Sequence, residues 1–177
     1  MSSTPDMTRL HVGGSEPKEG WKILNIQPGK AVDYVGDIQD LSQFANESWD
    51  EIYGSHVLEH VPQARVLPTL QGFHRILKAS GRLMISVPDL DILCRLFIDP
   101  RMTTATRFQV MKFIFGAQID ATDFHHIGFN FEFLVEFLTA AGFSRIERVA
   151  SFGIFNDYSS FAPYGVPISL NVEAFKK

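Results

Sequence analysis

The sequence has little of what marks secreted, membrane-spanning or nucleic-acid-binding proteins. Its 177 residues contain a single cysteine, Cys94, so no internal disulfide can form, which agrees with a reducing compartment. No apolar run approaches the ~20 residues that a membrane helix needs. The formal net charge is −4, and the Lys and Arg residues are scattered. This distribution argues against nucleic acid as a partner, because phosphate-binding proteins usually carry a basic face.

Two further absences narrow the class of protein. Residues 1–14 show no basic region followed by an apolar one, so we expect no secretory signal and a cytoplasmic location. No G-x-G-x-x-G motif opens a helix, which argues against a nicotinamide-binding domain. The remaining composition, 45% hydrophobic and 20% charged, is typical of a soluble protein, and the length predicts a single domain over residues 1–177.

The patterns that are present alternate between strands and helices. Four helices are expected: residues 62–78, a short helix capped by Asp89, residues 104–115, and one between the cap Asn130 and Gly142. In the third of these, we expect Phe108, Met111, Ile114 and Phe115 on one side. Strands are expected at 9–14, 21–26, 49–55, 81–88, 144–151 and 168–175. This order predicts an α/β sheet with helices on its faces.

The first half of the chain leaves little room for helices. A crossover between parallel strands usually takes about a dozen residues, whereas residues 15–22 and 27–30 are shorter connections. We therefore expect reduced helices in this half. The segment "AVDYVGD", residues 31–37, is either an antiparallel strand or not a regular strand.

The segment "GSHVLEHV", residues 54–61, contains an H-x-x-E-H pattern formed by His56, Glu59 and His60. In zinc peptidases this pattern places two imidazoles on successive turns of one helix, beside a glutamate base. Here a strand ends just before His56 and Pro62 follows His60 closely, so the helix would be too short. Nothing in the sequence positions a third ligand from His125 or His126.

We therefore expect no metal site and interpret this segment differently. Leu58 and Val61 are predicted to pack under the sheet, with Glu59 and His60 at its rim. His56 follows the end of a central strand, where open α/β sheets bind their ligands.

With these elements placed, the chain resembles the class I S-adenosylmethionine-dependent methyltransferases, in particular a short branch of predicted methyltransferases. The resemblance covers about residues 10–146 and, less specifically, the last strand. Its middle block, in which a strand, "SHVLEH", a helix, "HRILK", Gly, a strand and "VPD" follow in order, is hard to meet by chance. The other matching blocks are "LHVGG", "GW", "ILNIQP", "GDIQDLSQF" and "LTAAGFSRIE".

The resemblance implies a Rossmann-like three-layer sandwich with a mostly parallel sheet and an antiparallel C-terminal strand. It implies S-adenosylmethionine as cofactor. Gly13 and Gly14 would let the backbone approach the amino-acid end of that cofactor. Ser55 and His56 would edge its methionine portion.

At the adenosine end the resemblance implies three further residues. Asp37 matches the acid that takes the adenine amino group, and the Ile38 amide would lie near the ring. Asn25 stands where the family normally has an acid that accepts hydrogen bonds from both ribose hydroxyls. Because Asn offers only one acceptor oxygen, we expect weaker ribose binding.

Methyl transfer from a sulfonium is an in-line displacement, so the protein has to align the acceptor and take up its proton. The candidate catalytic residues are His125 and His126, in the segment "DFHHIGFN", with Asp89 for orientation. An aromatic set is expected to form either a lid or part of the core: Phe113, Phe115, Phe124, Phe129 and Phe131.

Two functions stay open at this stage. The first is a methyltransferase acting on a small-molecule or glycan acceptor, with no nucleic acid, no membrane span and a homodimer as an open alternative. The second is a degenerate binding or regulatory module of the same fold. It is suggested by Asn25 and by Ser15, which replaces a glycine that the family usually has in the first loop.

Overall fold

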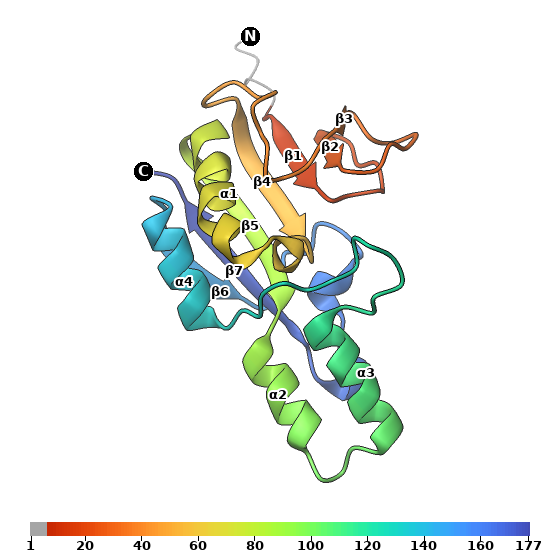
Figure 1. Ribbon diagram of the computed structural model, residues 1–177. Helices are drawn as coiled ribbons and strands as arrows, with labels where there is room; N and C mark the ends of the chain where they lie inside the picture. The colour runs from red at the N-terminus through yellow and green to blue at the C-terminus, as the bar shows by residue number, and fades with distance from the viewer. Residues whose placement is uncertain (1–6) are drawn as a thin grey trace.

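The computed structural model describes residues 7–177, so the first six residues of the segment tested for a secretory signal lie outside it. Within the described residues, seven strands form one sheet in the order β3-β2-β1-β4-β5-β7-β6 (Figure 1). Pairs among β1 to β5 are parallel, whereas β7 runs antiparallel to β5 and β6. The expected mostly parallel sheet with an antiparallel C-terminal strand is confirmed. The strands are β1 Arg9–Val12, β2 Trp21–Asn25, β3 Tyr34–Val35, β4 Trp49–Ser55, β5 Leu77–Pro88, β6 Ser144–Val149 and β7 Ser169–Phe175.

The helices begin and end close to where the sequence predicts them. They are α1 Gln63–Ile76, α2 Leu90–Ile98, α3 Thr104–Phe115 and α4 Phe131–Ala140, with 3-10 turns η1 Leu58–His60, η2 Tyr158–Ser160 and η3 Pro163–Gly165. The Asp89 side chain accepts from the Ile92 N–H, and the Asn130 side chain accepts from the Phe133 N–H, so both predicted caps are confirmed. Among the helices in the described part of the chain, none has the length and apolar character that crossing a membrane would require.

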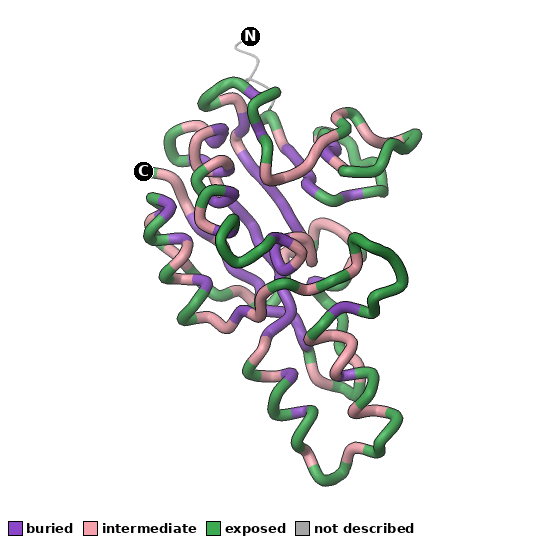
Figure 2. The backbone as a smooth tube through the Cα atoms, in the orientation of Figure 1, coloured by how far each residue is buried: buried purple, intermediate pink, exposed green. Residues whose placement is uncertain are grey.

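The sheet is covered differently on its two faces. Helices α1 and α4 pack on one face (Figure 1), and the strands beneath them are among the most buried parts of the chain (Figure 2). Residues 150–165, which include η2 and η3, contribute aromatic rings to the other face. There Tyr53 of β4 lies edge-on to Phe152, with ring centroids 5.4 Å apart, and 5.0 Å from Phe155. The sheet is therefore covered on both faces, by helices on one and by a loop with short 3-10 turns on the other.

The connection to β3 corrects one expectation. Leu24 and Asn25 pair with Tyr34 and Val35 in parallel, so the segment at 31–37 contains a two-residue parallel strand and no antiparallel one. The return is short because Asp33 holds it against β2: its N–H donates to the Ile23 carbonyl and its side chain accepts from the Ile23 N–H at 2.8 Å. No helix forms between β1 and β2, as the sequence predicted.

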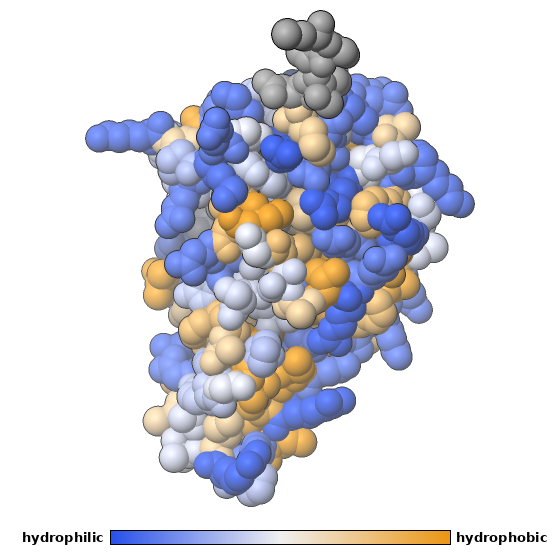
Figure 3. Space-filling model, turned by 180° about the vertical axis from the view of Figure 1, so that it is seen from behind, coloured by the Kyte–Doolittle hydropathy of each residue, from blue (hydrophilic) through white to orange (hydrophobic). Residues whose placement is uncertain are grey.

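Helices α2 and α3 form a hairpin that projects beyond the sheet (Figure 1) and has a small core of its own. The packed side of α3 differs from the prediction, because Val110 is buried while Phe108 and Phe115 are more than half exposed. The 100° step of a helix places Val110, Phe113 and Ile114 on a common side. From behind, hydrophobic side chains show on the lower part of the surface (Figure 3), where this hairpin and the approach to β7 lie.

Candidate functional site

A cavity of about 900 Å³ opens where β1, β2 and β4 end. It is lined by the loops that follow these strands and by the segment from Gln109 to His126, which includes the end of α3. The volume is within the range of small-molecule and cofactor sites. Because the carboxyl ends of parallel strands meet at one edge of the sheet, loops far apart in sequence contribute to one wall.

The glycines after β1 have separate roles. Gly13 lines the cavity with φ +76, and a Cβ added there would lie 2.2 Å from Val57 Cγ1. Only glycine adopts this conformation at low cost and lets the backbone approach so closely. Gly14 is not among the residues that line the cavity: a Cβ at Gly14 would meet the His11 ring at 2.4 Å. The structure thus explains Gly14 by packing against His11.

Asn25, at the end of β2, also lines the cavity, but both polar atoms of its side chain already form hydrogen bonds within the protein. Its Nδ2 donates to the Gly14 carbonyl at 2.9 Å, and its Oδ1 accepts from the Gln27 N–H at 2.9 Å. These bonds tie the loop after β1 to the loop after β2. They use the Nδ2 donor, which a carboxylate would lack, to hold the two loops together.

Asp37 and Ile38 both line the cavity, as the resemblance implied. The Asp37 carboxylate accepts from the Gln39 N–H at 2.9 Å and from Gln39 Nε2 at 3.1 Å. This turn fixes the carboxylate in the loop after β3. Each oxygen keeps lone pairs that a ligand donor can reach.

His56 lies directly after β4 in a left-handed conformation, φ 53, which is unusual for a non-glycine residue. Its N–H donates to the Ser86 carbonyl, and its Nε2 lies 2.8 Å from Ser169 Oγ. Burial lowers the pKa of His56 to about 4, so the ring is neutral at pH 7. Ser55, its neighbour, lines the cavity too.

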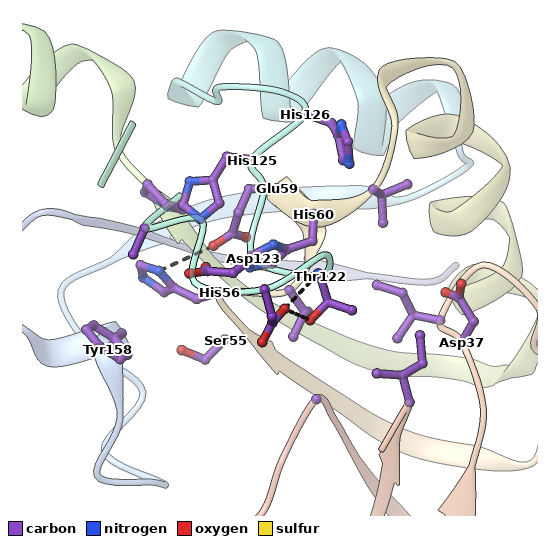
Figure 4. Close-up of a pocket in the computed structure, with 18 of the residues that line it drawn as sticks. Asp37, Ser55, His56, Glu59, His60, Thr122, Asp123, His125, His126 and Tyr158 are labelled. Atoms are coloured by element: carbon purple, nitrogen blue, oxygen red, sulfur yellow. Dashed lines mark hydrogen bonds and ion pairs between the residues drawn. The ribbon is translucent and has the colours of Figure 1, made fainter. Parts of the chain in front are cut away.

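The segment that carries His125 and His126 folds over the same cavity, and both residues line it (Figure 4). His125 packs edge-on against His60, with ring centroids 4.8 Å apart. Burial, and then the charge of His60, lower the pKa of His125 to about 4. His126 is exposed and points away from this pair in the close-up view.

Asp89, the third predicted catalytic residue, lies outside the lining of the cavity. Its side chain is 2% exposed, caps α2 and forms an ion pair with Arg148 Nη2 at 2.5 Å. The carboxylate therefore links the start of α2 to Arg148 of β6. These contacts give Asp89 a structural role, and its role in orienting the acceptor stays a prediction.

Glu59 corrects another expectation, because it is buried instead of lying at the rim. Leu58 and Val61 are buried as predicted, and η1 turns the chain sharply enough to bury Glu59 as well. Burial raises the pKa of the Glu59 carboxyl to about 8. The three-residue turn is too short to place His56 and His60 on successive helical turns, so the zinc-peptidase helix is absent here.

The aromatic set does not act as one unit. Phe113 lines the cavity and Phe129 is in the core, whereas Phe115 and Phe124 are exposed. Of the two alternatives, the core holds for Phe129 and a place at the cavity for Phe113, so the five rings do not form one common lid.

Comparisons with known proteins agree with this geometry. Residues 17–85, less than half of the chain, match the family described as a methyltransferase domain. The fold matches an S-adenosylmethionine-dependent methyltransferase from Archaeoglobus fulgidus with a TM-score of 0.61 and 16% identity, over 97% of this chain and 87% of that one. The chain therefore has the fold of S-adenosylmethionine-dependent methyltransferases, and residues 17–85 are similar in sequence to a methyltransferase domain.

Two other solved methyltransferases share the fold. One is the 1,6-didemethyltoxoflavin-N1-methyltransferase of Burkholderia thailandensis, with a TM-score of 0.59 and 16% identity, over 97% of this chain and 72% of that one. The other is an S-adenosylmethionine-dependent methyltransferase from Thermotoga maritima, with a TM-score of 0.54 and 17% identity, over 98% and 84%. No curated protein matches the chain in sequence.

Several residues of the site carry no signal of their role in the sequence. Glu59 and His60 were noticed only within the zinc pattern, and the lining also includes Lys112, Gln109 and Tyr158. The left-handed conformation of His56 and the burial of Glu59 depend on contacts with other elements. The sequence carries no local signal for either.

Proposed function

We propose that the protein binds S-adenosylmethionine in this cavity and transfers its methyl group to a small-molecule or glycan acceptor. The observation that carries the proposal is that the cavity lies at the carboxyl ends of β1, β2 and β4 with Gly13 and Asp37 in its wall. The Burkholderia thailandensis structure contains bound S-adenosylhomocysteine and 1,6-didemethyltoxoflavin. The shared fold supports a related cofactor here.

The residues of the cavity fit such a cofactor. At Gly13 the absent side chain leaves the backbone free to approach the ligand, since a Cβ would already touch Val57. Asp37 supplies a fixed carboxylate as an acceptor for an exocyclic amine. Asn25 contributes less, because its donor already binds Gly14. The cofactor, when bound, supplies an electrophilic methyl group.

The protein's own part in the reaction is to position the acceptor and receive its proton. His125 is neutral at pH 7, since its pKa is lowered to about 4, so its free ring nitrogen can accept a hydrogen bond from an acceptor hydroxyl or amine. A pKa this low makes the ring a weak base. We therefore assign His125 to orienting the acceptor and to brief proton transfer.

Isothermal titration with S-adenosylmethionine and S-adenosylhomocysteine tests the cofactor site. The protein should bind both, and Asp37→Ala should weaken binding by roughly 10-fold, the effect of about one charge-assisted hydrogen bond. Asp40→Ala is the matched control, because Asp40 forms the same kind of turn with Ser42 nearby but does not line the cavity. No binding at millimolar cofactor would contradict the proposal.

The second candidate function is a binding module that holds a cofactor without turnover. The engagement of Asn25 with Gly14 and Gln27 favours it, because the usual ribose acid is absent. Release of S-adenosylhomocysteine in the presence of small hydroxyl- and amine-bearing acceptors separates the two. Cofactor binding without any turnover across acceptor classes would favour the module.

A further inference from the structure

Three donor groups converge at the histidine end of the cavity. Glu59, His60 and His125 each offer one ligand atom, and these atoms lie within 4.8 Å of one another. Glu59 and His60 come from η1, whereas His125 comes from the segment between α3 and α4, more than sixty residues later. In the close-up view their side chains point toward one another (Figure 4). The fold therefore assembles a group that no local sequence motif specifies.

The Glu59 carboxylate is the most unusual member of this group. Its side chain is 1% exposed, and within residues 7–177 neither of its oxygens has a hydrogen-bond partner. Burying a carboxylate without compensation is costly, so an unpartnered one marks a place where a ligand or a proton is expected. His56 Nδ1 lies 3.3 Å from Glu59 Oε1, but the two atoms do not have hydrogen-bond geometry.

The hydrogen bonds around His56 determine which of its ring nitrogens carries the proton. Ser169 Oγ donates to the Tyr158 carbonyl at 2.7 Å, so it can only accept from His56 Nε2. A neutral His56 therefore carries its proton on Nε2 and directs the lone pair of Nδ1 toward Glu59. An ionised Glu59 would then face a second acceptor, and either a proton on its carboxyl or a cation bound by its oxygens removes the repulsion.

His60 is oriented as a ligand. Its Nδ1 lies 3.1 Å from the Phe124 carbonyl, which can only accept, so Nδ1 carries the proton and Nε2 keeps a free lone pair. Metal-binding histidines commonly donate their second ring nitrogen to a backbone carbonyl in this way, because the bond fixes both tautomer and ring orientation. Asp123 adds a negative charge near the ring.

We propose that Glu59, His60 and His125 form a binding site for a divalent transition-metal ion. Two imidazoles with one carboxylate suit zinc, iron or manganese, whereas calcium and magnesium prefer oxygen ligands alone. Three protein ligands leave coordination positions open toward the cavity. The arrangement differs from the zinc-peptidase helix, because His56 contributes its Nε2 to Ser169 and the third ligand comes from a distant loop.

The open positions suggest what the metal does. An ion there lies in the wall of the same cavity. In the metal-bound protein the ion, and not the His125 nitrogen that it occupies, would bind the acceptor oxygen and lower the pKa of its hydroxyl. This second step rests on the proposed methyl transfer, whereas metal binding itself rests only on the geometry of the three ligands. The two are tested separately.

The test of the site is titration of chelator-treated protein with Zn²⁺ by calorimetry and with Co²⁺ by visible absorption. The protein should bind one equivalent of Zn²⁺ and give a Co²⁺ spectrum with imidazole ligation. Glu59→Gln and His125→Ala should each weaken Zn²⁺ binding by more than the roughly 10- to 100-fold that follows loss of an outer-shell partner. His126→Ala is the matched control, because it removes the adjacent but exposed imidazole and should leave the affinity unchanged.

Absence of stoichiometric Zn²⁺ binding by the wild-type protein would overturn the site, and a proton shared by Glu59 and His56 would then account for the geometry. Equal affinity in wild type and in Glu59→Gln would overturn it too. Thermal unfolding without metal checks the folding of each variant, and the near-isosteric Glu59→Gln keeps the test valid if His125→Ala unfolds. Zn²⁺ binding without cofactor binding would retain the metal site and reject methyl transfer.

Discussion

The two ends of the cavity differ in how their side chains are held: one by local hydrogen bonds, the other by packing between distant segments. At the end formed by Gly13, Asn25 and Asp37, short loops satisfy the side-chain groups of Asn25 and Asp37 within a few residues. At the other end, Glu59 and the nearby imidazoles belong to distant segments, and their proton-binding groups are buried with few partners. The first end is prepared to hold a ligand by shape and fixed hydrogen bonds. At the second end the Glu59 oxygens have no hydrogen-bond partner within the described residues, so this end offers buried groups to a ligand or a proton.

Burial also shifts the pKa values of three groups at the histidine end of the cavity. The pKa of His56 and that of His125 are lowered to about 4, and that of Glu59 is raised to about 8, each mainly because burial disfavours the charged form. Clusters of perturbed groups in a cleft are typical of functional sites. At the glycine end, backbone geometry positions the groups that line the cavity, and the one strongly shifted pKa described there is that of His11, which lies beneath the loop.

The largest expected effect is at Gly13, and it tests whether the first end works by shape. In Gly13→Ala, an alanine would have to adopt a backbone φ of +76, and its Cβ would lie 2.2 Å from Val57 Cγ1. We therefore expect the free energy of unfolding to fall by about 2–4 kcal/mol and cofactor binding to be lost. Calorimetry and thermal unfolding measure both. Gly153→Ala is the control, because φ there is +64 but nothing lies within 4 Å of the added Cβ. Equal losses in both variants would leave only backbone strain as the cause.

Beneath the glycine loop, His11 is the titratable group that should make this end sensitive to acid. Burial lowers its pKa to about 4, against 6.5 unfolded, so the unfolded chain binds more protons between these values. Stability should fall as the pH drops from 6.5 to 4, by up to roughly 3 kcal/mol from this residue. His11→Phe, packed against Tyr53 and Phe155, should flatten the denaturation midpoints over this range. An unchanged slope would exclude His11 as the cause.

At the second end, the burial of Glu59 should cost stability whenever no cation is bound. In chelator-treated protein, Glu59→Leu should raise the free energy of unfolding by about 1–3 kcal/mol, because an apolar side chain needs no partner there. Urea denaturation measures the difference, with added Zn²⁺ expected to stabilise only the wild type. A less stable variant in chelator would indicate that the carboxyl is already satisfied by the protein.

The smallest expected effect concerns Asn25, where sequence and structure suggest different outcomes. A carboxylate would suit the ribose, but Asn25→Asp also replaces the donor that binds Gly14 and sets an anionic oxygen against that carbonyl. We expect a loss of about 1 kcal/mol of unfolding free energy. Tighter S-adenosylhomocysteine binding without loss of stability would show that the two loops do not depend on this bond.

Much of the fold could be predicted because it depends on local rules. Strand β4 was expected at 49–55 and α3 at 104–115, as found, because turn residues and caps mark their ends. Strand β3 was missed as a parallel strand because two residues carry no periodic pattern and its direction is set by Asp33 binding to Ile23. The bond between Asp89 and Arg148, 59 residues away in sequence, could not be predicted, because it depends on how β6 packs beside α2.

By itself, the sequence determined the order of strands and helices and the placement of Gly13, Asp37 and His56 after strand ends, because each depends on residues close together in the chain. Only the tertiary structure decided that Glu59 is buried and that His125 joins it and His60. Burial and proximity arise from packing between segments more than sixty residues apart, and that packing leaves no periodic trace in the sequence.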